Sequence, residues 1–213
     1  MSIEVKICGL STEATLDAAL DAGADLVGFV SFPKSPRHVA PEQAAALAER
    51  ARGKARVTLL TVDADDALLA DLVSAVAPDI LQLHGAESVQ RIKRLRTLYG
   101  REIWRAVPVS TADDVAAADP YWDVADRVLF DAKPPKGAVL PGGNGVAFDW
   151  DLIAGLDPKR RFVLSGGLTP ETVGPAVRAT RAPAVDVSSG VESAPGVKEP
   201  ELIAAFVRAA RSA

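Results

Sequence analysis

The stretch "EVKIC" (residues 4–8) is the first apolar run of the chain, and its alternation predicts the fold. Side chains of a β-strand point alternately to its two faces, so Val5 and Ile7 share one face while Lys6 and Cys8 share the other. A parallel sheet covered by helices on both sides would read as an almost unbroken apolar run. One apolar and one polar face therefore indicate a strand of a closed barrel, with helices outside and polar groups inside.

The same polarity recurs in later apolar runs. In "ILQLH" (80–84) the leucines share one face and the polar residues the other, and "VLFDA" (128–132) and "AVDVSSG" (184–190) also turn polar on one face. Active sites of (β/α)8 barrels lie at the carboxyl ends of the strands. Four polar positions at these ends are candidate site residues: Cys8, His84, Asp131 and Ser188.

Strand-like and helical stretches alternate along the chain, and several helical stretches open with start signals: Ser11 or Thr12, Pro41 and Thr169. The predicted strands are residues 3–8, 25–30, 56–62, 79–84, 102–109, 127–132, 161–166 and 184–190. Eight βα units in 213 residues predict an α/β fold, a (β/α)8 TIM barrel forming a single domain over residues 1–213. The rival open doubly wound sheet often carries G-x-G-x-x-G after its first strand, a turn that "CGLSTE" cannot form.

Composition argues against several classes of partner. The net charge of −4 opposes nonspecific binding to nucleic acid, which needs a basic surface. One cysteine cannot form an internal disulfide, and no run approaches the roughly 18 apolar residues of a membrane span. We therefore predict a cytoplasmic protein without membrane or nucleic-acid partners. The oligomeric state is left open, and a homodimer is compatible with the sequence.

Two loops predict a phosphate site. The seventh strand ends in "LSGGLTPE", where two glycines are expected to lead directly into a helix, and the eighth ends in "DVSSGVE". Glycines let backbone N–H groups approach a ligand, and in these barrels the loops after strands seven and eight frequently bind phosphate. The candidate phosphate-binding residues are Gly166, Gly167, Ser188, Ser189 and Gly190.

Cys8 and Asp131 are the candidate catalytic pair, although each also has an ordinary structural interpretation. A lone strand cysteine is more often a small buried apolar residue, and an aspartate can be a helix cap or an ion-pair partner. Strands one and six, however, lie nearly opposite one another in a barrel of eight. A thiol and a carboxyl facing each other across a ligand could remove one proton and deliver another.

Residues after strands two and four are candidates for substrate binding. Arg37, in a proline-flanked turn, could pair with a carboxylate through its planar guanidinium. His84 is either an acid–base group or a hydrogen-bonded structural histidine, and His38 is expected at the surface. With two histidines and no acidic cluster, the sequence predicts no metal site.

Two further expectations concern a loop and a buried charge. The long connection "KPPKGAVLPGGNGVAFDW" (133–150) has the length of a lid or a binding loop. Lys6, on the inward face of its strand, needs a counter-charge inside the barrel. Asp186 is the predicted partner, with Arg105 expected in the same neighbourhood.

Seven motifs, in order over nearly the whole chain, closely resemble the phosphoribosylanthranilate isomerases of tryptophan biosynthesis. They are "KICGL" (6–10), "FPKSPR" (32–37), "LQLHG" (81–85), "LFDA" (129–132), "GGNGVAFDW" (142–150), "LSGGL" (164–168) and "VDVSSGVE…PGVK" (185–198). The resemblance implies a (β/α)8 barrel and an aldose–ketose isomerase that needs no cofactor. The implied reaction is the Amadori rearrangement of N-(5-phosphoribosyl)anthranilate to 1-(2-carboxyphenylamino)-1-deoxyribulose 5-phosphate.

The resemblance also implies roles for individual residues. In the family the cysteine of the first strand is the general base and the aspartate ending strand six is the general acid, which here are Cys8 and Asp131. The arginine after strand two, here Arg37, helps to bind the anthranilate moiety. The glycines after strand seven and the "SSG" after strand eight resemble the family's phosphate site.

Two alternatives remain open at this point. The related isomerase of histidine biosynthesis has a similar phosphate site, but that family uses an aspartate where this chain has Cys8. Dual activity on both substrates stays open as well. From another class, a catalytically silent sensor of phosphate ligands could use the same scaffold, although the presence of Cys8 and Asp131 opposes it.

Overall fold

Eight parallel strands close into a barrel in the order β1 to β8, with β8 pairing with β1. The computed structural model describes residues 3–135, 137–138, 140–145, 147–157 and 159–213. The closed barrel confirms the predicted α/β fold and excludes the open doubly wound sheet. The strands are β1 (Glu4–Cys8), β2 (Leu26–Ser31), β3 (Arg56–Thr61), β4 (Ile80–Leu83), β5 (Glu102–Val109), β6 (Arg127–Ala132), β7 (Phe162–Leu164) and β8 (Ala184–Val187).

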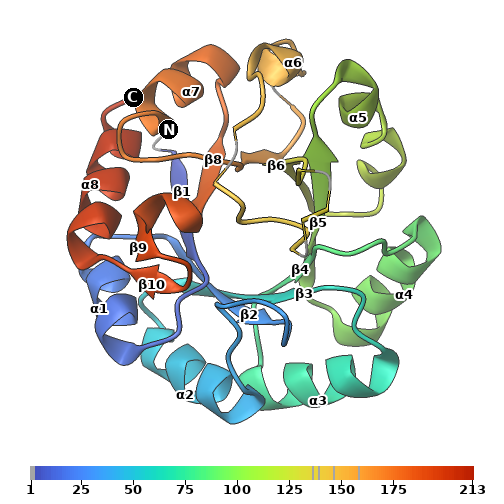
Figure 1. Cartoon of the computed structure of the whole chain (residues 1–213). Helices are drawn as coiled ribbons and strands as arrows, with labels where there is room; N and C mark the ends of the chain where they lie inside the picture. The colour runs from blue at the N-terminus through green and yellow to red at the C-terminus, as the bar shows by residue number, and fades with distance from the viewer. Residues whose placement is uncertain (1–2, 136, 139, 146, 158) are drawn as a thin grey trace.

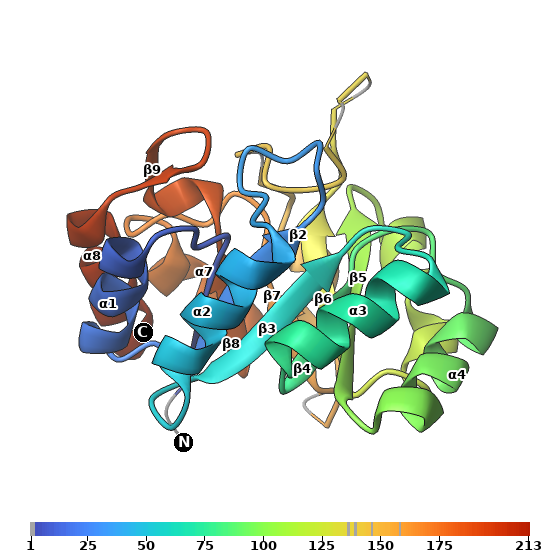
Figure 2. The same ribbon diagram turned by 90° about the horizontal axis from the view of Figure 1, so that it is seen from below.

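Helices form a ring outside the strands, as Figure 1 shows. They are α1 (Glu13–Asp21), α2 (Pro41–Ala51), α3 (Asp66–Val76), α4 (Val89–Tyr99), α5 (Ala112–Ala116), α6 (Asp151–Ala154), α7 (Val173–Thr180) and α8 (Pro200–Arg211), with the 3-10 turns η1 (Asp119–Tyr121) and η2 (Ser189–Val191). A short antiparallel hairpin of β9 (Glu192–Ala194) and β10 (Val197–Lys198) follows β8. In Figure 2 this hairpin and the loops after β2 and β6 project at the same end of the barrel. Among the described residues no helix has the length and hydropathy needed to cross a bilayer.

Local signals explain most helix boundaries. The Thr12 side chain accepts a hydrogen bond from the backbone N–H of Thr15 and caps α1, and Pro41 occupies the first turn of α2. The start signal at Thr169 was misread. The Thr172 hydroxyl accepts from the Thr169 N–H across a turn, and α7 begins only at Val173. Threonine and serine occur both at helix starts and in isolated turns, because in either place the side-chain hydroxyl can accept a hydrogen bond from a nearby backbone N–H.

The two faces of the strands separate as the alternation predicts. Val5 and Ile7 pack outward into the large core between the barrel and the helices, which they share with Val185 and Val187 of β8. Side chains from six strands fill the barrel interior below the carboxyl end: Leu26, Ile80, Trp104, Ala106, Leu129, Val163 and Ala184. The interior is therefore a packed plug beneath the polar layer that carries Cys8, Asp131 and Asp186.

The inward charge of Lys6 has the partner that was expected. Its Nζ donates to Asp186 Oδ1 at 2.8 Å, and Lys6 and Asp186 are paired in register where β1 meets β8. The expectation for Arg105 was wrong. Since Trp104 faces into the barrel, the next residue points out among the helices, where Arg105 donates to the carbonyl of Gly85 at 2.7 Å.

Trp104 tests the packed plug, because it is the largest fully buried side chain and is completely shielded from solvent. We expect Trp104→Ala to reduce the free energy of unfolding by about 3–5 kcal/mol, since a large cavity opens inside the barrel. Urea unfolding followed by circular dichroism measures the change. Leu98→Ala, at a leucine that is 58% exposed, is the control and should change the value by less than about 0.5 kcal/mol. A loss below about 1 kcal/mol for Trp104→Ala would show that the plug does not support the fold.

Candidate active site

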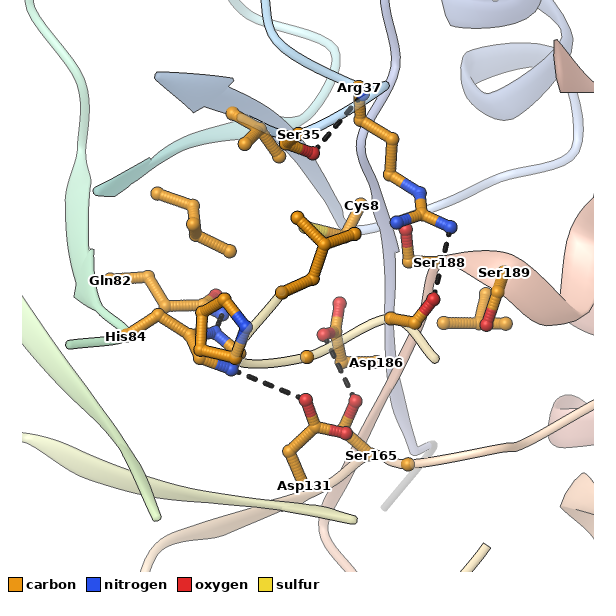
Figure 3. Close-up of a pocket in the computed structure, with 18 of the residues that line it drawn as sticks. Cys8, Ser35, Arg37, Gln82, His84, Asp131, Ser165, Asp186, Ser188 and Ser189 are labelled. Atoms are coloured by element: carbon orange, nitrogen blue, oxygen red, sulfur yellow. Dashed lines mark hydrogen bonds and ion pairs between the residues drawn. The ribbon is translucent and has the colours of Figure 1, made fainter. Parts of the chain in front are cut away.

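One pocket at the carboxyl end of the barrel brings together every residue that the sequence nominated. It contains about 640 Å³ of space, part of which is open to solvent. The nominated residues that line the pocket are Cys8, Arg37, His84, Asp131, Gly166, Gly167, Ser188, Ser189 and Gly190. Figure 3 shows the side chains of Cys8, Asp131 and Arg37 arranged around the same space. The polar strand ends thus converge, as parallel strands of a barrel require.

Cys8 lies at the wall of the pocket with only 3% of its surface exposed. Burial raises the pKa of its thiol above the ordinary value. The ammonium of Lys6 opposes this effect on the pKa, whereas Asp186 adds to it. The thiol is therefore the resting form at neutral pH, and any role as a base depends on the charges around it.

Asp131 ends β6 on the other side of the pocket and is 5% exposed. Its Oδ1 accepts a hydrogen bond from the Ala132 N–H at 2.9 Å, and its Oδ2 lies 3.3 Å from Nε2 of His84. Gln82 Nε2 lies 3.4 Å from the other ring nitrogen, Nδ1. The carboxyl group caps no helix, because the next helix, α6, begins at Asp151. Asp131 is thus a buried acid beside a histidine, held with one oxygen on the backbone and the other facing the pocket.

The loop after β6 closes over these groups. A Cβ built on Gly142 would overlap Oδ2 of Asp131 and lie 2.7 Å from Nε2 of His84. At Gly143, a Cβ would lie 2.6 Å from Nη1 of Arg37. Glycine lets the backbone approach these side chains without displacing them, and Gly143 also has a positive φ of 69°, which favours glycine. The predicted binding loop therefore lies directly against the candidate acid and the arginine.

Arg37 lines the pocket, but its guanidinium is engaged by a carboxylate of the protein itself. Nε and Nη2 donate to the two oxygens of Glu192, each at 2.7 Å, and Nη2 also donates to the Gly143 carbonyl at 3.2 Å. The turn before it is held locally, since the Arg37 N–H donates to Ser35 Oγ. His38 is not the surface residue that was expected. It is half-buried, and its Nδ1 accepts from the Phe32 N–H, which fixes the same turn.

Sequence reasoning missed Glu192 and Lys198 as functional residues. Glu192 joins Arg37 to Lys198, whose Nζ donates to Glu192 at 2.5 Å and to the Ser188 carbonyl at 2.9 Å. Burial alone would raise the pKa of Glu192, but Arg37 and Lys198 hold that pKa below its usual value. Burial lowers the pKa of Lys198, although Glu192 acts in the opposite direction. Both residues belong to the motif "VDVSSGVE…PGVK", so a signal was present in the sequence.

The loops after β7 and β8 both contribute to the wall of the pocket. Gly166 and Gly167 have positive φ angles of 82° and 64°, and a Cβ on Gly190 would overlap the Leu168 carbonyl. These positions require glycine, and they leave backbone rather than side chains at the pocket wall. The helix α7 does not follow Gly167 directly as expected, because it begins six residues later at Val173.

No cluster of three or more His, Cys, Asp or Glu side chains has a metal-binding arrangement within the described ranges. The groups that line the pocket and can act chemically are the thiol of Cys8, the carboxyl groups of Asp131 and Asp186, the imidazole of His84 and the guanidinium of Arg37. Such a set can transfer protons between sites on one ligand, and the guanidinium can hold an anionic one.

Comparisons with known proteins agree with this geometry. Residues 5–209 match the family model described as N-(5'phosphoribosyl)anthranilate (PRA) isomerase. A protein named N-(5'-phosphoribosyl)anthranilate isomerase from Rhodopseudomonas palustris (strain BisA53) is 58% identical over 212 residues, covering 100% of this chain and 97% of that one. A protein of the same name from Azorhizobium caulinodans is 59% identical, covering 100% of this chain and 93% of that protein.

Solved structures give the same result. The phosphoribosyl anthranilate isomerase of Thermotoga maritima superposes with a TM-score of 0.89 at 34% identity, covering 99% of this chain and 100% of that one. Another structure, described as phosphoribosyl anthranilate isomerase in complex with reduced 1-(o-carboxyphenylamino)-1-deoxyribulose 5-phosphate, gives a TM-score of 0.85 at 32% identity, with 99% and 100% coverage. The family model and the full-length relatives together place this chain in the phosphoribosylanthranilate isomerase family.

Proposed function

We propose that this chain converts N-(5-phosphoribosyl)anthranilate to 1-(2-carboxyphenylamino)-1-deoxyribulose 5-phosphate, a step of tryptophan biosynthesis. The observation that carries the proposal is one pocket in which a thiol from β1 and a carboxyl group from β6 lie beside glycine-lined loops and a buried arginine. Membership of the family supports the reaction itself. The roles of the individual residues are part of the proposal.

The substrate carries two anionic groups, and the pocket lining offers residues for each of them. The phosphate would lie against the backbone of Gly166, Gly167 and the segment 188–190, where no large side chain intervenes. The anthranilate carboxylate would lie toward Arg37 and the loop that carries Gly143. Binding both anionic ends fixes the ribose between them, which lowers the entropic cost of reaction at its carbons.

Asp131 would act first, as the general acid. In its protonated form it donates a proton to the ring oxygen of the ribose, and the C1′–O4′ bond breaks with its electron pair going to that oxygen. The nitrogen lone pair then forms a C1′=N iminium. His84, within 3.3 Å of the carboxyl group, is placed to orient it.

Cys8 would act second, as the general base. Its thiolate removes the proton at C2′, forming the S–H bond, and the C2′–H electron pair becomes the C1′=C2′ double bond of an enolamine. The iminium nitrogen takes back its electrons and so serves as the electron sink. Tautomerisation of the enolamine gives the ketone: C1′ gains one proton and the C2′ hydroxyl loses one. Net transfer of the Cys8 proton to C1′ and of the hydroxyl proton to Asp131 restores both side chains to their starting forms. The reaction therefore needs no donor or acceptor of protons or electrons other than the substrate and these two side chains.

For this chain, a cytoplasmic location and a homodimer stay predictions. A Thermotoga maritima relative is described as a dimeric phosphoribosylanthranilate isomerase from which monomers were generated. That description concerns the relative and sets no oligomeric state for this chain.

Loss of either proton-transfer group should abolish most of the activity. We expect Cys8→Ala and Asp131→Asn each to lower kcat by about 10²–10⁴-fold, the usual contribution of a general acid or base. A fluorescence assay that follows consumption of freshly prepared phosphoribosylanthranilate measures the rate. Thr58→Val, a nearly isosteric change at a buried barrel position outside the pocket lining, is the control and should retain activity. Near-normal turnover by either variant would remove that residue from the mechanism.

Glu192 should matter for substrate binding more than for chemistry. Glu192→Gln keeps the shape of the side chain but removes the charge that holds Arg37 and Lys198 in place. We expect KM to rise about tenfold or more with a smaller change in kcat, because charge-assisted hydrogen bonds contribute about 1.5–3 kcal/mol. Glu201→Gln, at an exposed glutamate of α8, is the matched control. An unchanged KM would show that Arg37 needs no such support.

The raised pKa of Cys8 predicts a slow thiol at neutral pH. Because only the thiolate reacts with iodoacetamide, alkylation should accelerate with increasing pH and reach half its maximal rate above the midpoint of an ordinary cysteine, about pH 8.5. Mass spectrometry reads the modification, and a free cysteine-containing peptide is the reference. A midpoint below that of the peptide would contradict the assigned environment.

A further inference from the structure

Lys6 is a fully buried cation that the proposed mechanism leaves unused. Its side chain is 0% exposed and points into the barrel from β1, two residues before Cys8 on the same face. It does not line the substrate pocket, whereas Cys8 and Asp186 do. A buried ammonium is costly unless it is paired, and Asp186 at 2.8 Å provides the pairing.

The ammonium of Lys6 lies next to the sulfur of Cys8. A Cβ built on Gly28, in the neighbouring strand β2, would lie 2.9 Å from Cys8 Sγ and 3.1 Å from Lys6 Nζ. Both atoms therefore converge on the space that the glycine leaves. An ammonium has three N–H groups, and Asp186 accepts from one of them. The remaining donors of Lys6 are close enough to stabilise negative charge on the sulfur.

Other charged groups around Cys8 also affect whether its sulfur is protonated. Asp186 faces it from β8, and Lys198 faces it from β10. Across the pocket lie Asp131 of β6, His84 after β4 and, after β2, Arg37, which is already paired with Glu192. Burial works to lower the pKa of Lys6, but Asp186 and Cys8 together hold that pKa above its usual value, so the ammonium persists.

We propose that Lys6 is a positioning residue that stabilises Cys8 as a thiolate, with Asp186 as the fixed counter-ion of the pair. The inference rests on the proposed role of Cys8 as the base. Before proton transfer, the cation is shared between the thiolate and Asp186. After the sulfur has taken the proton from C2′, Lys6 still has Asp186 as its partner. The buried ammonium of Lys6 therefore has an anionic partner whether Cys8 is a thiolate or a thiol, and it is not left unpaired when the sulfur becomes neutral.

The chain contains one cysteine, so alkylation by iodoacetamide reports on Cys8 alone. The experiment measures the pH dependence of alkylation in the full chain, with Lys6→Met, Asp186→Asn and the double variant. Lys6→Met removes the cation and keeps the length of the side chain, and the double variant removes both buried charges together. Thr58→Val is the control for an uncharged change inside the barrel, and Cys8→Ala is the blank.

The proposal predicts opposite shifts for the two single variants. In Lys6→Met the alkylation midpoint should rise by about one pH unit or more, which slows the reaction about tenfold at a fixed pH below the midpoint. In Asp186→Asn it should fall, and in the double variant it should rise by less than in Lys6→Met. For Lys6→Met, kcat should decrease while KM changes little, because Lys6 does not line the pocket.

An unchanged midpoint in Lys6→Met overturns the proposal. If Lys6→Met does not fold, the other two variants test the proposal. A higher alkylation midpoint in Asp186→Asn, or an unchanged midpoint in the double variant, then overturns it. The outcome is separate from that of the proposed function. Full activity of Cys8→Ala would remove Cys8 as the base, while the alkylation midpoints would still show whether Lys6 controls the charge of the sulfur.

Discussion

The ion pair between Lys6 and Asp186 is the interaction on which the site depends. It joins side chains 180 residues apart, at the register position where the first and last strands close the barrel. Two charges in so dry a place are tolerated only as a pair. The pair also lies beneath Cys8 and forms a floor there. The same two side chains therefore join the first and last strands of the barrel and set the electrostatic environment of the candidate base.

Above this floor, a second buried charge cluster organises the rim of the pocket. Glu192 holds Arg37 through two hydrogen bonds and binds Lys198 as well, which ties the loop after β2 to the hairpin after β8. The glycines of the loop after β6 lie against Arg37 and Asp131. Three loops that are distant in sequence are thereby fitted to each other before any substrate binds, and such preorganisation lowers the cost of binding.

The sequence predicted the barrel, the direction of its strand faces and the membership of the pocket, because period-2 alternation and the carboxyl-end rule are local signals. For Arg105 the alternation alone was not sufficient, because it places Trp104 and Arg105 on opposite faces but only the structure shows that Trp104 faces inward. The pairing of Arg37 with Glu192 was not predictable in this way. It joins residues 155 positions apart through a hairpin whose orientation no local pattern specifies. The resting charge of Cys8 likewise depends on burial and on three neighbours from separate strands.

The central claim is that a sulfur and a carboxyl group reach one bound sugar from opposite walls of the barrel. A crystal structure of this chain with reduced 1-(o-carboxyphenylamino)-1-deoxyribulose 5-phosphate tests it most directly. The account predicts Cys8 Sγ within about 3.5 Å of C2′ and the Asp131 carboxyl group within hydrogen-bonding distance of O4′, with the phosphate at Gly166 and Ser189. A structure in which Cys8 and Asp131 contact the sugar from the same side, or in which the phosphate lies away from these loops, would contradict the account.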